Sequence, residues 1–70
     1  MDGTKIIKKF LVEKDTNTVE LAKRLNCGTA NLYNKYKRNN FSLNEMEAIA
    51  DAFDCDLNVT FIDRATGKEI

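Results

Sequence analysis

Residues 21–38 concentrate positive charge around a short turn. This stretch holds five basic residues and no acidic one, although the whole chain balances 11 Lys and Arg against 11 Asp and Glu. Residues 42–70 have the opposite bias, with seven acids against Arg64 and Lys68. Basic side chains neutralise phosphates and release the counterions of a polyanion. The dipolar pattern therefore predicts a nucleic-acid-binding face, with an acidic half turned away from it. The basic residues of the stretch are Lys23, Arg24, Lys35, Lys37 and Arg38.

Residues for other kinds of chemistry are scarce. The chain has no histidine, its only serine stands at an expected helix cap (Ser42), and its three glycines are too scattered for a phosphate loop. Cys27 and Cys55 lie 28 positions apart with no C-x-x-C pair, which favours free thiols over a zinc site or a disulfide. We therefore expect no enzyme, no metal and no cofactor.

The length and composition predict one soluble domain over residues 1–70. The chain is 43% hydrophobic and 31% charged, which is ordinary for a globular protein. It has no long apolar run and no signal-peptide pattern, so we expect a cytoplasmic protein without membrane contact. There is no room for a sensor domain, so no small-molecule ligand is expected.

Two helices are predicted in the first part of the chain. The first runs over about 5–14, with Thr4 as its cap. The second starts at Asn17, which forms a capping-box pattern with Glu20, and ends at Asn26, a residue that tolerates left-handed backbone. Apolar residues at helical spacing supply a buried side to each helix. They are Ile6, Ile7, Phe10 and Leu11, then Val19, Leu21, Ala22 and Leu25.

Two more helices are predicted before residue 56. The third opens after Gly28, and Leu32 and Tyr36 anchor it one turn apart. The fourth has a strong entry signal, because Ser42 and Glu45 form an S-x-x-E capping box. Its apolar stripe is Leu43, Met46, Ile49, Ala50 and Phe53.

The period then changes to that of a β-strand. Leu57, Val59 and Phe61 alternate with other residues, 64–67 are typical of a turn, and 68–70 could return as a second strand. We expect a C-terminal β-strand or hairpin over residues 57–70. Its free edge could pair with a second copy of the chain, or the hairpin could only seal the core. The candidate dimer-interface residues are Leu57, Val59, Phe61 and Ile62.

Residues 17–38 meet the geometric needs of a helix-turn-helix. Ala22 is small where two steeply crossing helices touch, Asn26 permits the sharp turn, and Leu32 anchors the second helix. The stretch N-T-V-E-L-A-K-R-L-N-C-G-T-A-N-L-Y-N-K-Y resembles the helix-turn-helix of lambda-repressor/Cro-like (Xre-type) regulators. The following S-L-N-E-M-E-A-I-A-D-A-F-D-C-D-L also resembles that family, so the resemblance covers about residues 5–56.

This resemblance implies a mainly α fold of four short helices (about 4–56), with a central helix-turn-helix and the C-terminal strand or hairpin. It implies a sequence-specific transcriptional regulator of double-stranded DNA, with helix 29–38 in the major groove. Repression is the default for so small a protein. A homodimer would read half-sites about one DNA turn apart.

Individual DNA contacts follow from the outward face of that helix and from its flanks. Asn34 is the strongest candidate, because an amide can pair bidentately with adenine, and Thr29 and Ala30 could touch a thymine methyl. The predicted base contacts are Thr29, Ala30, Tyr33 and Asn34. The predicted phosphate contacts are Thr18, Lys37, Arg38 and Asn40.

An alternative function stays open at this point. The small residues Gly28, Thr29 and Ala30 at the start of the recognition helix, together with zero net charge, would also suit a protein-interaction adaptor. Such an antitoxin-like or anti-repressor-like protein would keep the fold without reading DNA. Salt dependence separates the two, since DNA affinity falls steeply with salt.

Overall fold

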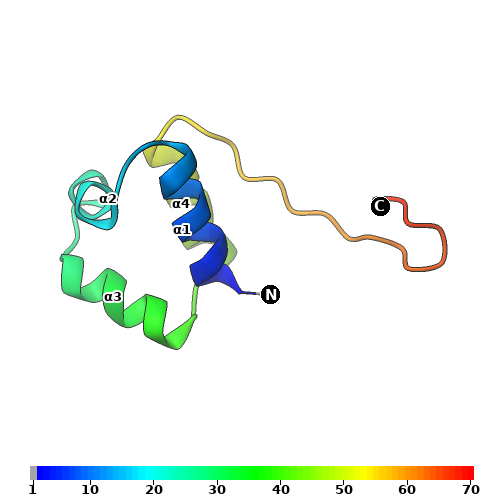
Figure 1. Cartoon of the computed structure of the whole chain (residues 1–70), viewed down its shortest axis with the longest axis horizontal. Coiled ribbons are helices and arrows are strands. Elements are labelled where there is room, and N and C mark those ends of the chain that lie inside the picture. Colours follow the sequence, from blue (N-terminus) through cyan, green and yellow to red (C-terminus); the bar gives the residue numbers. More distant parts are fainter. Residues whose placement is uncertain (1) are drawn as a thin grey trace.

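The computed structural model describes residues 2–70 and contains four helices. These are α1 (Gly3–Glu13), α2 (Thr18–Leu25), α3 (Thr29–Arg38) and α4 (Leu43–Ala52), which confirms the predicted mainly α fold. Figure 1 shows the helices gathered at one end of the molecule, with the residues after α4 running away from them as an extended tail. The overall dimensions are 43 × 25 × 20 Å.

Side-chain caps determine where three of the helices begin. Asn17 Oδ1 accepts a hydrogen bond from Glu20 N at 2.9 Å. Ser42 and Glu45 form the reciprocal capping box, with both bonds at 3.1 Å, so both predicted starts are confirmed. Helix α1 begins earlier than expected, because Asp2 rather than Thr4 accepts the capping bond, from Lys5 N. Thr4 is thereby free to bond with α3.

Asparagine and aspartate turn the chain at the end of every helix. Asp15, Asn26, Asn39 and Asp54 have φ of 52°, 54°, 51° and 58°, which is the left-handed region. Their short polar side chains make that conformation less costly than it is for other non-glycine residues. The chain thus makes the three connections between helices, and the turn into the tail after α4, without glycine or proline at these positions.

All four helices contribute to one core. Leu21 of α2 is fully buried, and Ala22 beside it is buried as the helix crossing requires. Phe10 of α1 and Phe53 after α4 pack edge to face, with ring centroids 5.9 Å apart. The core cluster is Ile7, Leu11, Leu21, Ala22, Leu32, Tyr36, Ile49 and Phe53.

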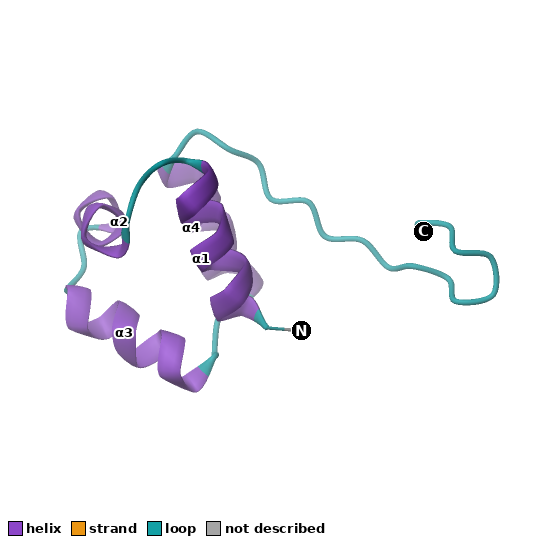
Figure 2. Ribbon diagram, viewed as in Figure 1, coloured by secondary structure: helices purple, strands orange, loops and turns teal. Residues whose placement is uncertain are grey.

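The predicted C-terminal strand or hairpin is wrong. Residues 57–70 form no strand; they contain only one isolated antiparallel bridge, between Ile62 and Glu69. A strand needs a neighbour for its backbone groups, and 57–60 run beside no other extended segment (Figure 2). The tail therefore does not seal the core: Val59 and Ile62 are exposed, and Phe61 is 78% exposed. Among the four candidate interface residues, Leu57 alone is half-buried.

No helix in residues 2–70 has both the length and the apolar character needed to cross a membrane.

Candidate nucleic-acid interface

A tight turn joins α2 to α3 and sets the direction of α3. Asn26 adopts the left-handed conformation, and Cys27 N donates to Ala22 O at 3.0 Å, which closes the end of α2. Gly28 is extended and precedes α3, which has no side-chain cap at this end. Helix α3 then lies along one edge of the helical body, with nothing drawn beyond it (Figure 1). The predicted turn is thus present and leaves one side of α3 open.

The inner side of α3 is anchored by the two predicted residues. Leu32 is 3% and Tyr36 is 7% exposed. The Tyr36 ring packs against Phe41 and against Tyr33, with centroids 5.9 Å and 6.0 Å away. Tyr36 therefore provides the second anchor of the helix.

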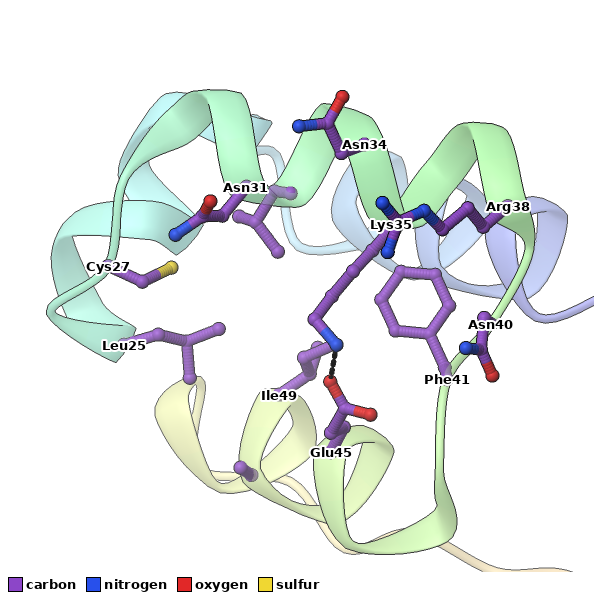
Figure 3. A pocket seen from close by; sticks show the side chains of 12 residues that line it. Leu25, Cys27, Asn31, Asn34, Lys35, Arg38, Asn40, Phe41, Glu45 and Ile49 are labelled. Atoms are coloured by element: carbon purple, nitrogen blue, oxygen red, sulfur yellow. Dashed lines mark ion pairs between the residues drawn. The ribbon is translucent and has the colours of Figure 1, made fainter.

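The outer side of α3 carries the predicted base contacts. Ala30, Tyr33 and Asn34 are exposed, and Thr29 is half-buried. Positions 30, 33, 34 and 37 follow the three- and four-residue spacing of one helical face. In Figure 3 the Asn34 amide lies on the outer side of α3, at the edge of the pocket that the figure shows. The structure therefore brings these side chains to one accessible stripe.

The predicted phosphate contacts fall into two places. Lys37 and Arg38 end α3, Asn40 follows it, and all three are exposed. Thr18 lies at the start of α2 and is half-buried, with its Oγ1 3.1 Å from the Tyr36 hydroxyl oxygen. Thr18 is thus linked to α3 through Tyr36.

Lys35 is engaged in an ion pair that the sequence did not reveal. Its ammonium pairs with Glu45 of α4, while the other Glu45 oxygen accepts from Ser42 N (Figure 3). The hydrogen bond from Lys35, followed by that from the Ser42 backbone, lowers the pKa of Glu45 below its ordinary value of 4.5. Because the partners come from different helices, no local spacing signals the pair. The pair joins α3 to the start of α4.

Arg24 also belongs to the scaffold. Its guanidinium stacks 4.5 Å from the centre of the Phe53 ring, donates to Ala52 O at 2.9 Å, and pairs with Glu20. Of the five basic residues in the charged stretch, Lys35 and Arg24 are therefore occupied by contacts within the protein. Lys23, Lys37 and Arg38 have no ion-pair partner within the described residues.

Helix α1 reaches the same interface, which the sequence interpretation missed. The Thr4 backbone N–H donates to Asn39 Oδ1 at 3.0 Å, and Thr4 Oγ1 donates to Tyr36 O at 2.9 Å. Lys8 lies over the Tyr36 ring, with its ammonium 5.3 Å from the ring centroid. The sequence predicted only a core role for α1, because its apolar residues recur at helical spacing whereas Thr4 and Lys8 belong to no recognisable pattern.

Comparison with known proteins identifies the family. The model of a Cro/C1-type helix-turn-helix DNA-binding domain matches residues 6–58, which include α2, α3 and α4 and most of α1. This match confirms the resemblance seen in the sequence. No curated protein and no solved structure matches the chain significantly.

Proposed function

Because the chain belongs to the Cro/C1-type helix-turn-helix DNA-binding family, we propose that it is a sequence-specific transcriptional regulator that inserts α3 into the major groove of double-stranded DNA. The observation that carries this proposal is the division of α3 into two sides. Leu32 and Tyr36 hold the inner side in the core, while Ala30, Tyr33 and Asn34 remain accessible on the outer side. A major groove about 12 Å wide can admit a helix presented in this way.

Base recognition in this proposal depends on the outer stripe of α3. Asn34 donates to and accepts from an adenine, because its amide matches the adenine edge. Thr29 and Ala30 supply apolar contact to a thymine methyl, and Tyr33 contacts a neighbouring thymine methyl. The small residues at positions 29 and 30 would let the start of α3 approach the bases closely.

Phosphate contacts in this proposal flank the stripe. Lys37, Arg38 and Asn40 bind the backbone beyond the end of α3, and Thr18 binds it beside the start of α2. These contacts provide affinity and register but little sequence preference. The exposure of Lys37 and Arg38, and the lack of an acidic partner for either within residues 2–70, support their role.

We further propose that the protein acts as a homodimer through its tail and represses transcription by occupying its operator. The exposed apolar side chains of Val59, Phe61 and Ile62, and the unpaired backbone groups of residues 57–60, would be covered by the same segment of a second copy. A pair of α3 helices would then read half-sites about 34–36 Å apart.

Selection from random double-stranded DNA at two salt concentrations tests the function. We expect salt-sensitive retention and an enriched two-fold-symmetric sequence. Failure to retain DNA even at low salt would contradict the proposal. A firm protein partner in its place would support the adaptor alternative.

A further inference from the structure

We propose that Lys8, Thr18 and Tyr36 form a second backbone-phosphate site, which we call the α1–α2 clamp. Lys8 and Thr18 contact the phosphate, and Tyr36 is a positioning residue that holds both of them. This inference rests on the proposed DNA binding and extends it to α1. None of the basic residues of α1 belongs to the charged stretch that first indicated nucleic-acid binding.

Tyr36 joins three helices at one point. Its hydroxyl oxygen is 3.1 Å from Thr18 Oγ1 of α2, and the face of its ring lies under the Lys8 ammonium of α1 at 5.3 Å. Its carbonyl accepts from Thr4 Oγ1 at 2.9 Å, which attaches the start of α1 to the end of α3. Since Tyr36 is 7% exposed, its ring has little freedom to move. One rigid ring thus orients a cation and a hydroxyl from two other helices.

The hydroxyl pair has a definite direction once a phosphate is bound. Each hydroxyl has a single proton to donate, and a phosphodiester oxygen can only accept. Thr18 must therefore donate to the phosphate and accept from Tyr36. The tyrosine hydroxyl then satisfies the threonine oxygen and fixes its rotamer toward the DNA.

Lys8 is available for such a contact. The ion pairs within residues 2–70 are Arg24–Glu20 and Lys35–Glu45, so no carboxylate neutralises Lys8. Lys8 and Tyr36 both line an open hollow at the seam between α1 and the end of α3. Asp2 and Lys5 also line this hollow, and Asp2 Oδ1 accepts the α1 capping bond from Lys5 N. Lys8 is exposed, and its ammonium and the Thr18 hydroxyl each contact the Tyr36 side chain.

The first test measures DNA affinity as a function of salt for Lys8→Gln. Each lost phosphate contact should reduce the slope of log affinity against log salt by about 0.9. Lys9→Gln is the matched control, because it removes the same charge from the next residue, about 100° around the helix. We expect the slope to fall for Lys8→Gln and to change much less for Lys9→Gln. Equal slopes for the two variants would overturn the role of Lys8.

The second test concerns the positioning role of Tyr36. Tyr36→Phe keeps the buried ring and removes only the hydroxyl, and we expect affinity to fall roughly three- to tenfold with the salt slope unchanged. Thr18→Val should lower affinity to a similar extent. Thr18→Ser keeps the hydroxyl, so it should bind DNA about as tightly as the wild-type protein. The double variant should lose no more than the larger single loss, since the two hydroxyls act as one unit. Additive losses, or wild-type affinity for Tyr36→Phe, would refute the positioning role.

DNA binding by the protein and phosphate binding by the α1–α2 clamp can be tested separately. If the wild-type protein does not bind DNA, the proposed function is wrong and the clamp with it. If the wild-type protein selects a DNA sequence and Lys8→Gln binds it with the wild-type salt slope, only the clamp is wrong.

Discussion

Lys35 of α3 and Glu45 of α4 form an ion pair that connects α3 to the capping box of the next helix. Glu45 uses one oxygen for Lys35 and the other for the backbone of Ser42. The position of α3 and the start of α4 are therefore coupled through one carboxylate. Two basic residues of the charged stretch, Lys35 and Arg24, are thus occupied by contacts within the protein.

This coupling makes the free energy of unfolding depend on pH. The pKa of Glu45 is lowered in the folded protein, mainly by Lys35, so its ionised form stabilises the fold above the ordinary value of 4.5. That stabilisation is lost as the pH falls through the lowered pKa. We expect Glu45→Gln to reduce the free energy of unfolding by up to about 1 kcal/mol at pH 7, since a partly exposed pair contributes little. Urea unfolding from pH 3 to pH 7 should show the two proteins converging in acid; a constant difference would contradict this prediction.

The core offers a prediction about stability. Leu21 is 0% exposed, so Leu21→Ala should cost about 2–5 kcal/mol through lost burial and a residual cavity. A chain of 70 residues has little stability in reserve, and we expect a large fraction of this variant to be unfolded at 37 °C. Val19→Ala on the same helix is the control, because Val19 is 49% exposed. Thermal unfolding followed by circular dichroism would measure both, and equal losses would argue against the position assigned to α2.

Base and phosphate contacts predict different changes in DNA binding. Asn34→Ala should relax preference at one base position by about 1–3 kcal/mol and leave the salt slope nearly unchanged. Replacing both Lys37 and Arg38 with alanine should weaken binding to all sequences and reduce the slope by about 2. Titration of the selected DNA and of single-base variants would separate these effects. The site assignment is wrong if neither protein differs from wild type.

Changing an exposed apolar residue of the tail should weaken the proposed dimer. Phe61 is 78% exposed, and Phe61→Asp would place a charge where a second copy is proposed to pack. We expect the dimer to weaken at least tenfold while the helical content stays the same. Val12→Asp is the control, since Val12 is 75% exposed on α1 and outside the tail. Sedimentation at several concentrations would measure the change, and a monomeric wild-type protein would remove the dimer proposal altogether.

Local patterns in the sequence determined the four helices and their order. A cap such as Ser42 acts on a backbone group three residues away, and the burial of Leu21 or Leu32 follows from a helical period. Both depend on neighbours along the chain, so they can be read without tertiary structure. The same patterns gave the helix-turn-helix and the outward stripe with Asn34.

Only the tertiary structure decided which charges and hydroxyls meet. Lys35 finds Glu45, and Lys8 and Thr18 meet at Tyr36, because separate helices pack around one core. The tail also depended on the tertiary structure, because its strand pattern needs a partner segment. The alternation at Leu57, Val59 and Phe61 describes a chain able to form a strand, but a strand exists only where a second segment completes its hydrogen bonds. Within one copy of residues 2–70 no such segment lies beside 57–60, so their backbone stays extended and unpaired.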